Sequence, residues 1–349
     1  MKTSFISNIG VQTSMRNTIS SAQAQLIKAQ KEIATGTFAD RGVSLGWETG
    51  RSINLSTDVN RIQTLMDSNA IVDDRLQGSQ AAMTSIEGNM QTVRDALLAL
   101  SGSQDQTLLK TAVQTTTNAI ESFIAAGNTS ANGEYLFAGI NTDVKPLADY
   151  DAASAAKATF DSNFTTFFGF PPTSTQVNTI TAAQMDTFIT GTLEPLYTGA
   201  QWNTDWSTAS DTNMQTRIST AETVTTSTNA NEDGFRMFAL GGVIAKELLA
   251  LDIGADVRQV VSENAISYIN AGITGINAQR TAIGLSQERL SAANDTLSSQ
   301  KNIIESSFKK LIEVDAYEAS TLVNALKTQV ETSYTLTARI QQLSLVNYL

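Results

Sequence analysis

Proline is confined to the middle of this 349-residue chain, and this distribution limits the possible fold more than any other feature. A proline inside a helix removes a backbone hydrogen bond and collides with the preceding turn, so long helices need proline-free sequence. The chain offers two such arms, residues 1–145 and 196–349. The four prolines between them are Pro146, Pro171, Pro172 and Pro195. We therefore predict two helical arms that flank a centre of different construction.

The first arm carries apolar residues at the spacing of a helix that packs against a neighbour. Steps of four and three alternate, as in a coiled-coil seam. The seam consists of Met15, Ile19, Ala22, Leu26, Ala29 and Ile33. Gly36 predicts the end of this helix, because glycine commonly follows the last helical residue. We expect an irregular connector over 37–52, which contains three glycines, and further helices over 53–100 and 106–126.

The second arm carries a stricter repeat of large apolar residues at every seventh position. These residues are Ile276, Ile283, Leu290, Leu297, Ile304 and Leu311. The companion positions are mostly polar (Arg280, Asn294 and Lys301), so the stripe is narrower than that of a complete leucine zipper. A final helix is predicted to place one face of apolar residues near the C-terminus. This face holds Leu322, Leu326, Val330 and Tyr334, followed by Leu336, Ile340 and Leu343.

The centre of the chain differs from both arms. Residues 141–235 hold eleven acidic and three basic side chains, so most of the chain's net charge of −11 lies there. Threonines and aromatic residues are dense in this segment, which favours strands and loops with a few short helices. Just before it, Asn132-Gly133 followed by a β-prone run indicates a hairpin. We predict a mainly α, elongated rod with the N- and C-terminal helices side by side, plus an inserted central domain with β and loop content.

The composition excludes several classes of function. The chain contains neither cysteine nor histidine, which removes thiolate nucleophiles, zinc fingers and every mechanism that needs imidazole. The negative net charge argues against a nucleic-acid partner. No apolar stretch is long enough to span a membrane, and the N-terminus lacks the apolar core of a cleavable signal. We expect no membrane insertion and no bound cofactor or metal.

A few short motifs imitate functional sites, but each has a simpler interpretation. Ser307 and Lys310 match the spacing of a serine–lysine pair, without the companion motifs of those enzymes. Residues 229–234 imitate half of a calcium loop, although Leu240 stands where a glutamate is required. Paired acidic residues in the aromatic centre leave glycoside hydrolysis open as an enzymatic alternative. A chain without catalytic residues is the preferred interpretation.

Four segments of the chain resemble the flagellin superfamily, and within it the family of hook–filament junction proteins, also termed hook-associated protein 3. Residues 132–146 resemble that family's N-G-x-Y-x-F-A-G-x-x-T-x-x-x-P segment. Residues 312–319 are similar to the short acidic link before its last helix, and 343–345 to its L-S-L ending. Residues 34–36 resemble its S-T-G helix stop, whereas the usual D-D-P-A that follows is missing.

The resemblance implies a flagellin-like layout of the domains. Residues 1–37 and 318–349 would be terminal coiled-coil helices in an inner layer. Residues 38–140 and 236–317 would form a helical rod with a short β-hairpin, and 141–235 an outer domain. The assembly interface would consist of Ile19, Leu26, Ile33, Leu322, Leu326, Ile340 and Leu343.

The resemblance also implies a structural, non-enzymatic role as a junction adaptor between hook-associated proteins and the flagellin filament. Its partners would be adjacent copies of itself, flagellin, the preceding hook-associated protein and a cytoplasmic export chaperone. It would be extracellular, exported through the flagellar type III channel without a cleaved signal peptide. Two alternatives stay open: filament flagellin itself, and a secreted adhesin or fibre that binds glycans through its aromatic centre.

Overall fold

The computed structural model describes residues 8–346 apart from 102 and 104, and within that range the side chains of residues 10–339. The chain forms two compact units. The terminal unit consists of residues 1–64 and 298–349, and the central unit of residues 65–297. Both boundaries fall inside the two longest helices, α3 (Thr49–Leu100) and α10 (Ala255–Ile312). The predicted mainly α fold is confirmed.

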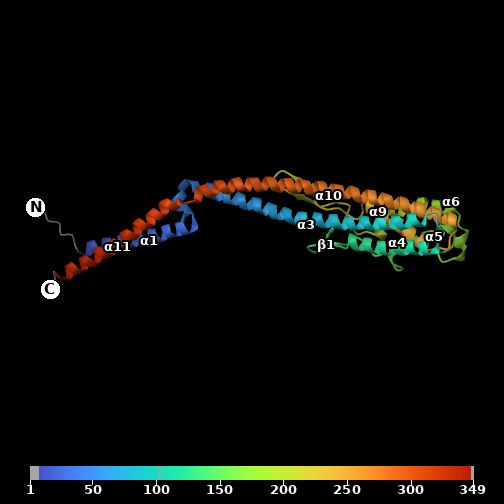
Figure 1. The fold of residues 1–349 in the computed structure, drawn as a ribbon, viewed down its shortest axis with the longest axis horizontal. Helices are drawn as coiled ribbons and strands as arrows, with labels where there is room; N and C mark the ends of the chain where they lie inside the picture. The colour runs from blue at the N-terminus through green and yellow to red at the C-terminus, as the bar shows by residue number, and fades with distance from the viewer. Residues whose placement is uncertain (1–7, 102, 104, 347–349) are drawn as a thin grey trace. The chain divides into compact units, whose positions relative to one another are not determined.

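The terminal unit is built on a pair of helices that come from opposite ends of the sequence. Figure 1 shows α1 (Asn8–Thr35) lying alongside α11 (Ala316–Val346). The end of α1 just before Gly36 agrees with the prediction. The connector is more regular than expected, since it contains α2 (Arg41–Leu45) and the 3-10 turn η1 (Gly46–Glu48). Asp40 starts α2 by accepting a hydrogen bond from the backbone N–H of Val43 at 3.0 Å.

The central unit buries an apolar stripe on each of its two long helices, α3 and α10. On α3 the buried apolar side chains include Met83, Ile86, Met90, Val93, Leu97 and Leu100. On α10 the first four residues of the heptad column, Ile276, Ile283, Leu290 and Leu297, are also buried. The last two, Ile304 and Leu311, belong to the terminal unit and are only half-buried. The apolar column on α10 is therefore fully buried only in the central unit.

The polar companion positions on α10 bond to α3 instead of facing water. Arg280 forms an ion pair with Glu87, and Asn294 accepts a hydrogen bond from Asn69 at 2.7 Å. In the terminal unit, the ammonium group of Lys301 donates to the carboxamide oxygen of Gln63 at 2.7 Å. These bonds satisfy polar groups between two long helices. They explain why an incomplete heptad still holds α10 against α3.

A short hairpin follows α4 (Gln106–Gly127), as predicted. Strands β1 (Ser130–Ala131) and β2 (Glu134–Tyr135) pair antiparallel, with Ala131 opposite Glu134. The two turn residues, Asn132 and Gly133, have positive φ angles of 54° and 84°. Such angles are typical of the tight turn that matches the twist of two strands. The guanidinium of Arg75 on α3 bonds to the carboxylate of Glu134 and so fixes the hairpin to the helix.

The segment 141–235 contains more helix than the sequence suggested. Its helices are α5 (Ala155–Phe168), α6 (Ala182–Phe188), α7 (Glu194–Thr198) and α8 (Trp202–Asp205), with a 3-10 turn η2 (Thr175–Thr179) and a π-turn η3 (Ile189–Leu193). Its strands are β3 (Gln215–Arg217) and β4 (Thr223–Thr225), paired antiparallel with Thr216 opposite Val224. Phe160, Phe164 and Phe168 stand four apart on α5 and contact one another. Their helical spacing outweighs the β-propensity of aromatic residues.

The helix α9 (Asp233–Val243), continued by the π-turn η4 (Ile244–Leu248), packs against α10 and completes the core of the central unit. At the crossing, Gly234 and Gly275 lie so close that a Cβ atom added to Gly275 would sit 2.6 Å from the Cα of Gly234. Only glycine allows two backbones to approach this closely. Among the described helices, none has the length and apolar character needed to cross a bilayer.

Candidate assembly surface

The seam between α1 and α11 alternates large aliphatic side chains with alanines. Ala22 and Leu326 are buried at its centre with Val330, and Leu26 packs against them. Ile19 and Ala29 are also buried on the same face of α1. The two alanines, Ala22 and Ala29, let the two helices approach but bury little apolar area. The pair therefore gains only modest stability from its own contacts.

One end of the helix pair is fastened by backbone hydrogen bonds. The N–H of Phe38 donates to the carbonyl of Ile312 at 3.0 Å, and the N–H of Val314 donates to the carbonyl of Gly36 at 3.1 Å. The carboxylate of Asp315 accepts the N–H groups of Tyr317 and Glu318, at 2.8 and 3.3 Å, and so caps α11. The acidic link that precedes the last helix thus starts that helix and joins it to the end of α1.

Polar contacts complete the pair farther along. The carboxamide of Gln23 donates to the hydroxyl of Tyr334 at 2.7 Å. Both residues also line a groove of about 510 Å³ between α1 and α11. The other residues along this groove are Gln12, Arg16, Ile19, Ser20 and Thr337. The groove is thus lined by one buried isoleucine, one arginine and several amide and hydroxyl groups.

Large apolar side chains remain exposed on the terminal unit. Tyr317 is 83% exposed and Ile27 is 67% exposed, although both residues could pack well in a core. The others on α1 and α11 are Ile33, Leu322, Tyr334 and Leu336. Each of these side chains would gain about 25 cal/mol per Å² of apolar area if a partner covered it. This set of exposed side chains is the candidate assembly surface.

The seven predicted interface residues divide into three groups. Ile19, Leu26 and Leu326 lie in the seam of the chain's own helix pair. Ile33 and Leu322 are exposed and belong to the candidate assembly surface. The side chains of Ile340 and Leu343 lie outside the described residues. A role of all seven in assembly stays a prediction.

Sequence reasoning missed part of this surface. Ile27 lies next to the seam position Leu26, and the spacing rule alone assigns it to the solvent side. In the connector, Trp47 on η1 is 87% exposed and Val43 on α2 is 75% exposed. These three residues could have been identified in the sequence as large apolar residues that lie outside the expected seam. An exposed tryptophan is unusual enough to mark a further contact point on the terminal unit.

The aromatic residues of the centre are packed against one another. The rings of Trp202 and Trp206 stack with centroids 5.6 Å apart, and Tyr150 stacks on Trp206 at 5.1 Å. All three are buried. Burial raises the pKa of the Tyr150 phenol, whose hydroxyl donates to the carboxylate of Glu247 at 3.1 Å. Sugar binding needs an accessible ring face, so these three rings give no support to the glycan-binding alternative.

Polar residues of the motifs that imitate functional sites form hydrogen bonds within the chain. The hydroxyl of Ser307 donates to the carbonyl of Ile303 at 3.0 Å, one turn earlier in α10. In the imitation calcium loop, the carboxamide oxygen of Asn231 accepts the indole N–H of Trp202 at 2.9 Å. The amide nitrogen of Asn231 donates to Asp211 at 2.7 Å. These polar atoms hold the segment before α9 in place.

Comparisons with known proteins agree with the arrangement of the arms. The family model of the bacterial flagellin N-terminal helical region matches residues 6–142, and that of the C-terminal helical region matches residues 266–349. Together the two matches cover more than half of the chain. A search of curated proteins finds no match.

One similar solved structure comes from Vibrio parahaemolyticus and is provisionally described as a flagellar hook-associated protein. It aligns with a TM-score of 0.54 and 11% sequence identity, over 77% of this chain and 99% of that chain. At this level of identity the likeness shows a shared fold.

Proposed function

This chain belongs to the flagellin family, and from that premise we propose that it is the adaptor that joins the hook-associated proteins to the flagellin filament. As a family member it is a structural protein of the extracellular flagellum that assembles with neighbouring subunits. The specific place in the flagellum is our proposal. It would dock through its terminal helices onto the preceding hook-associated protein on one side and flagellin on the other.

The observation that carries the proposal is the candidate assembly surface. The helix pair of one chain buries one short seam of aliphatic residues and leaves Ile27, Leu322 and Leu336 exposed. Isolated helices with so little buried area are marginally stable in water and need further partners. Neighbouring subunits that cover these side chains would supply the missing apolar contacts.

Two observations favour the junction over the filament. Residues 132–146 resemble the segment of the junction family, and the structure uses this segment for the β1–β2 hairpin turn. The similar fold from Vibrio parahaemolyticus carries a hook-associated description. The family models themselves are those of flagellin, so filament flagellin is the second candidate.

The exposed apolar side chains of the terminal helices would also need a covering partner before the chain is exported. An apolar helix pair would associate prematurely if it were exposed in the cytoplasm. We propose that a cytoplasmic chaperone covers the C-terminal helix α11 until the chain leaves the cell through the type III channel. A complex between the chaperone and the full-length chain, lost on deletion of residues 318–349, would support this step.

A charge placed on the candidate assembly surface tests the proposal. We expect Leu322→Glu to leave the free chain folded, because Leu322 is 46% exposed, and to abolish motility. Asn324→Glu is the matched control, since Asn324 is exposed and lies two positions away on a different face of α11. Motility that survives Leu322→Glu and also survives deletion of residues 318–349 would contradict a role of this helix in assembly.

Immunogold labelling of intact flagella distinguishes the two candidates. The adaptor is expected to give a single cluster of gold at the junction of hook and filament. Filament flagellin would give gold along the whole filament. The second pattern would overturn the adaptor role and leave membership of the family intact.

A further inference from the structure

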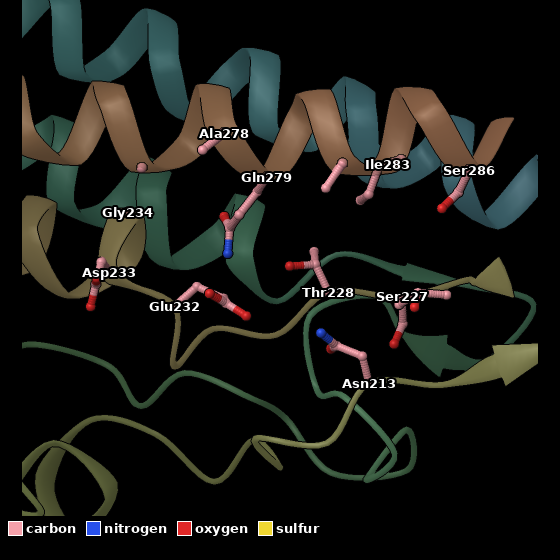
Figure 2. A pocket seen from close by; sticks show the side chains of 13 residues that line it. Asn213, Ser227, Thr228, Glu232, Asp233, Gly234, Ala278, Gln279, Ile283 and Ser286 are labelled. Carbon is pink, nitrogen blue, oxygen red and sulfur yellow. The ribbon is translucent and has the colours of Figure 1, made fainter. Parts of the chain in front are cut away.

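A pocket of the central unit and the groove on the terminal unit differ in what they offer to a partner. Figure 2 shows the pocket, which holds about 340 Å³ between α10 and the start of α9. Both polar atoms of the Gln279 carboxamide are fully buried there without a hydrogen-bond partner, and Gly234 of α9 lies against Gly275 of α10. These contacts make the pocket part of the core packing. The groove between α1 and α11 instead presents exposed side chains, among them Arg16 and Tyr334.

The connector of the terminal unit carries an uncovered indole with a carboxylate beside it. Trp47 on η1 is 87% exposed, which is more than any other large apolar side chain among the described residues. An aromatic side chain buries about 150–250 Å² when a partner covers it, so this indole forgoes a large apolar contact. The next residue, Glu48, is partly buried and forms no ion pair with a described residue.

The groove between α1 and α11 complements these two side chains. Its volume of about 510 Å³ lies in the range of pockets that hold small organic molecules, so an indole ring fits within it. Ile19 and the ring of Tyr334 give it apolar walls, and Gln12 and Ser20 supply oxygen atoms that can accept an indole N–H. Arg16 is the basic residue of this lining, is exposed, and forms no ion pair within the described part of the chain. A guanidinium attracts both a carboxylate and the face of an aromatic ring.

The indole of a chain stands outside its own groove. Arg16 lies about 28 Å before the last residue of α1, at a rise of 1.5 Å per residue. The backbone bonds between residues 36–38 and 312–314 hold the connector at that end of the helix. The guanidinium of Arg41 then lies over the ring of Phe308 on α10. The indole and the groove are therefore separate parts of one unit, as a head-to-tail contact between copies requires.

We propose that Trp47 inserts into the groove between α1 and α11 of a neighbouring copy of this chain, where Glu48 pairs with the neighbour's Arg16. The indole packs on Ile19 and Tyr334 of that copy. Because the two halves of the contact lie at different places on each copy, repetition links many copies into a closed ring or a helix. The inference rests on the proposed assembly through the terminal helices, and it does not depend on where in the flagellum the chain lies.

The absence of cysteine allows a direct test in isolated flagella. Arg16→Cys with Glu48→Cys places one thiol in the groove and one beside the indole, and a short bis-maleimide can join them. We expect a ladder of linked copies that extends beyond the dimer, with the link between positions 16 and 48 identified by mass spectrometry. Links within one chain only, dimers only, links to another protein or no link would overturn the proposal.

Asn17→Cys with Glu48→Cys is the matched control for the cross-link. Asn17 is exposed on α1, next to Arg16, but it does not line the groove. Consecutive residues of a helix point in different directions, so this pair should give little or no ladder. A ladder of equal yield from both pairs would contradict docking into the groove.

Replacement of the indole separates docking from folding. Trp47→Ala in the background with thiols at positions 16 and 48 is expected to lower the yield of the ladder about fivefold, because the apolar contact is lost. Trp47→Phe should retain most of the yield, since it keeps an aromatic ring. The thermal midpoint of the free chain should not change in Trp47→Ala, because the side chain is 87% exposed. An unchanged yield in Trp47→Ala would contradict the proposal, whatever happens to the midpoint.

Exchange of the two charges tests the pairing without a cross-linker. Arg16→Glu and Glu48→Arg are each expected to lower the amount of this chain in isolated flagella about threefold, as measured by immunoblot, because like charges then face each other. A chain that carries both changes restores the pair and should recover the original amount. Recovery reports a contact between copies, since the two side chains form no ion pair within one chain. Single changes without effect, or a double change without recovery, would contradict the pairing.

The outcome can be separated from that of the proposed function. The position of the gold label along the flagellum tests the junction role and does not depend on Trp47. Cross-linking between copies tests the contact of Trp47 with the groove and does not depend on where those copies lie. A ladder from a chain whose label runs along the whole filament would support the contact and overturn the junction role.

Discussion

The burial of a polar residue in this chain is explained by hydrogen bonds to residues that are distant in the sequence. Asn69 is fully buried on α3 and donates to Asn294 at 2.7 Å and to the carbonyl of Ile218 at 2.9 Å. It therefore links α3 to α10 and to the end of the β3 strand. In the sequence it is one polar residue on a helix, and nothing in the local pattern distinguishes it from a solvent-facing asparagine. Its partners are 149 and 225 positions away.

Two buried tyrosines make the stability of the chain sensitive to alkaline pH. Burial raises the pKa values of Tyr150 and Tyr197 above the ordinary value of about 10. The unfolded chain then loses its phenolic protons before the folded chain does. The resulting stability is fully present below pH about 10 and falls as the pH rises further.

The measurement for this prediction is the free energy of urea unfolding between pH 8 and pH 11. We expect a decline above pH about 10 that is shallower in Tyr150→Phe, because one of the tyrosines with a raised pKa is then absent. The same slope in both proteins would contradict the assignment of the decline to Tyr150.

At the scale of elements, the start of α11 decides how the terminal helix pair is fastened. Asp315 caps the helix, and the adjacent backbone bonds to the end of α1. We expect Asp315→Ala to destabilise this helix start by about 1 kcal/mol, since a helix N-cap loses its hydrogen bonds. Faster hydrogen exchange in the first turn of α11 would report the loss.

Asp315→Asn is the control for the cap, because asparagine caps helices nearly as well as aspartate. Its exchange rates should stay close to those of the unchanged chain. Equal rates in the Ala and Asn variants would mean that the backbone bonds between residues 36–38 and 312–314 hold the helix without the cap.

At the scale of the whole molecule, the two units differ in how much apolar surface they bury. The central unit contains one large core to which α3, α4, α5, α9 and α10 contribute. The buried cluster of the terminal unit is much smaller, with Ala22, Leu326 and Val330 buried and Leu26 packed against them. Local opening is easiest where few apolar contacts are buried. The terminal unit is therefore expected to open first.

Hydrogen exchange of the full chain tests this difference between the units. Amides of α1 and α11 should exchange well before those of residues 83–97 on α3 in the free chain. In assembled flagella the amides of α1 and α11 should become protected, because neighbouring subunits cover them. Slow exchange of both helices in the free chain would contradict the idea that the terminal unit needs partners.

The sequence alone determined the helical arms, their apolar stripes, the hairpin turn at Asn132-Gly133 and the end of the first helix. These features depend on local rules, namely periodicity, proline exclusion and turn geometry. The sequence also indicated that the arms pair, because each stripe needed a partner.

Only the tertiary structure decided which residues of the predicted interface are buried and which are exposed. Ile19 and Ile33 belong to one stripe, yet the first is buried and the second is 40% exposed. Local spacing cannot distinguish them, because burial depends on where α11 lies against α1. The helical centre and the unpaired amide of Gln279 likewise depend on segments that meet only in the folded chain. The physical reason is that contacts between distant residues follow packing, which no short window of sequence contains.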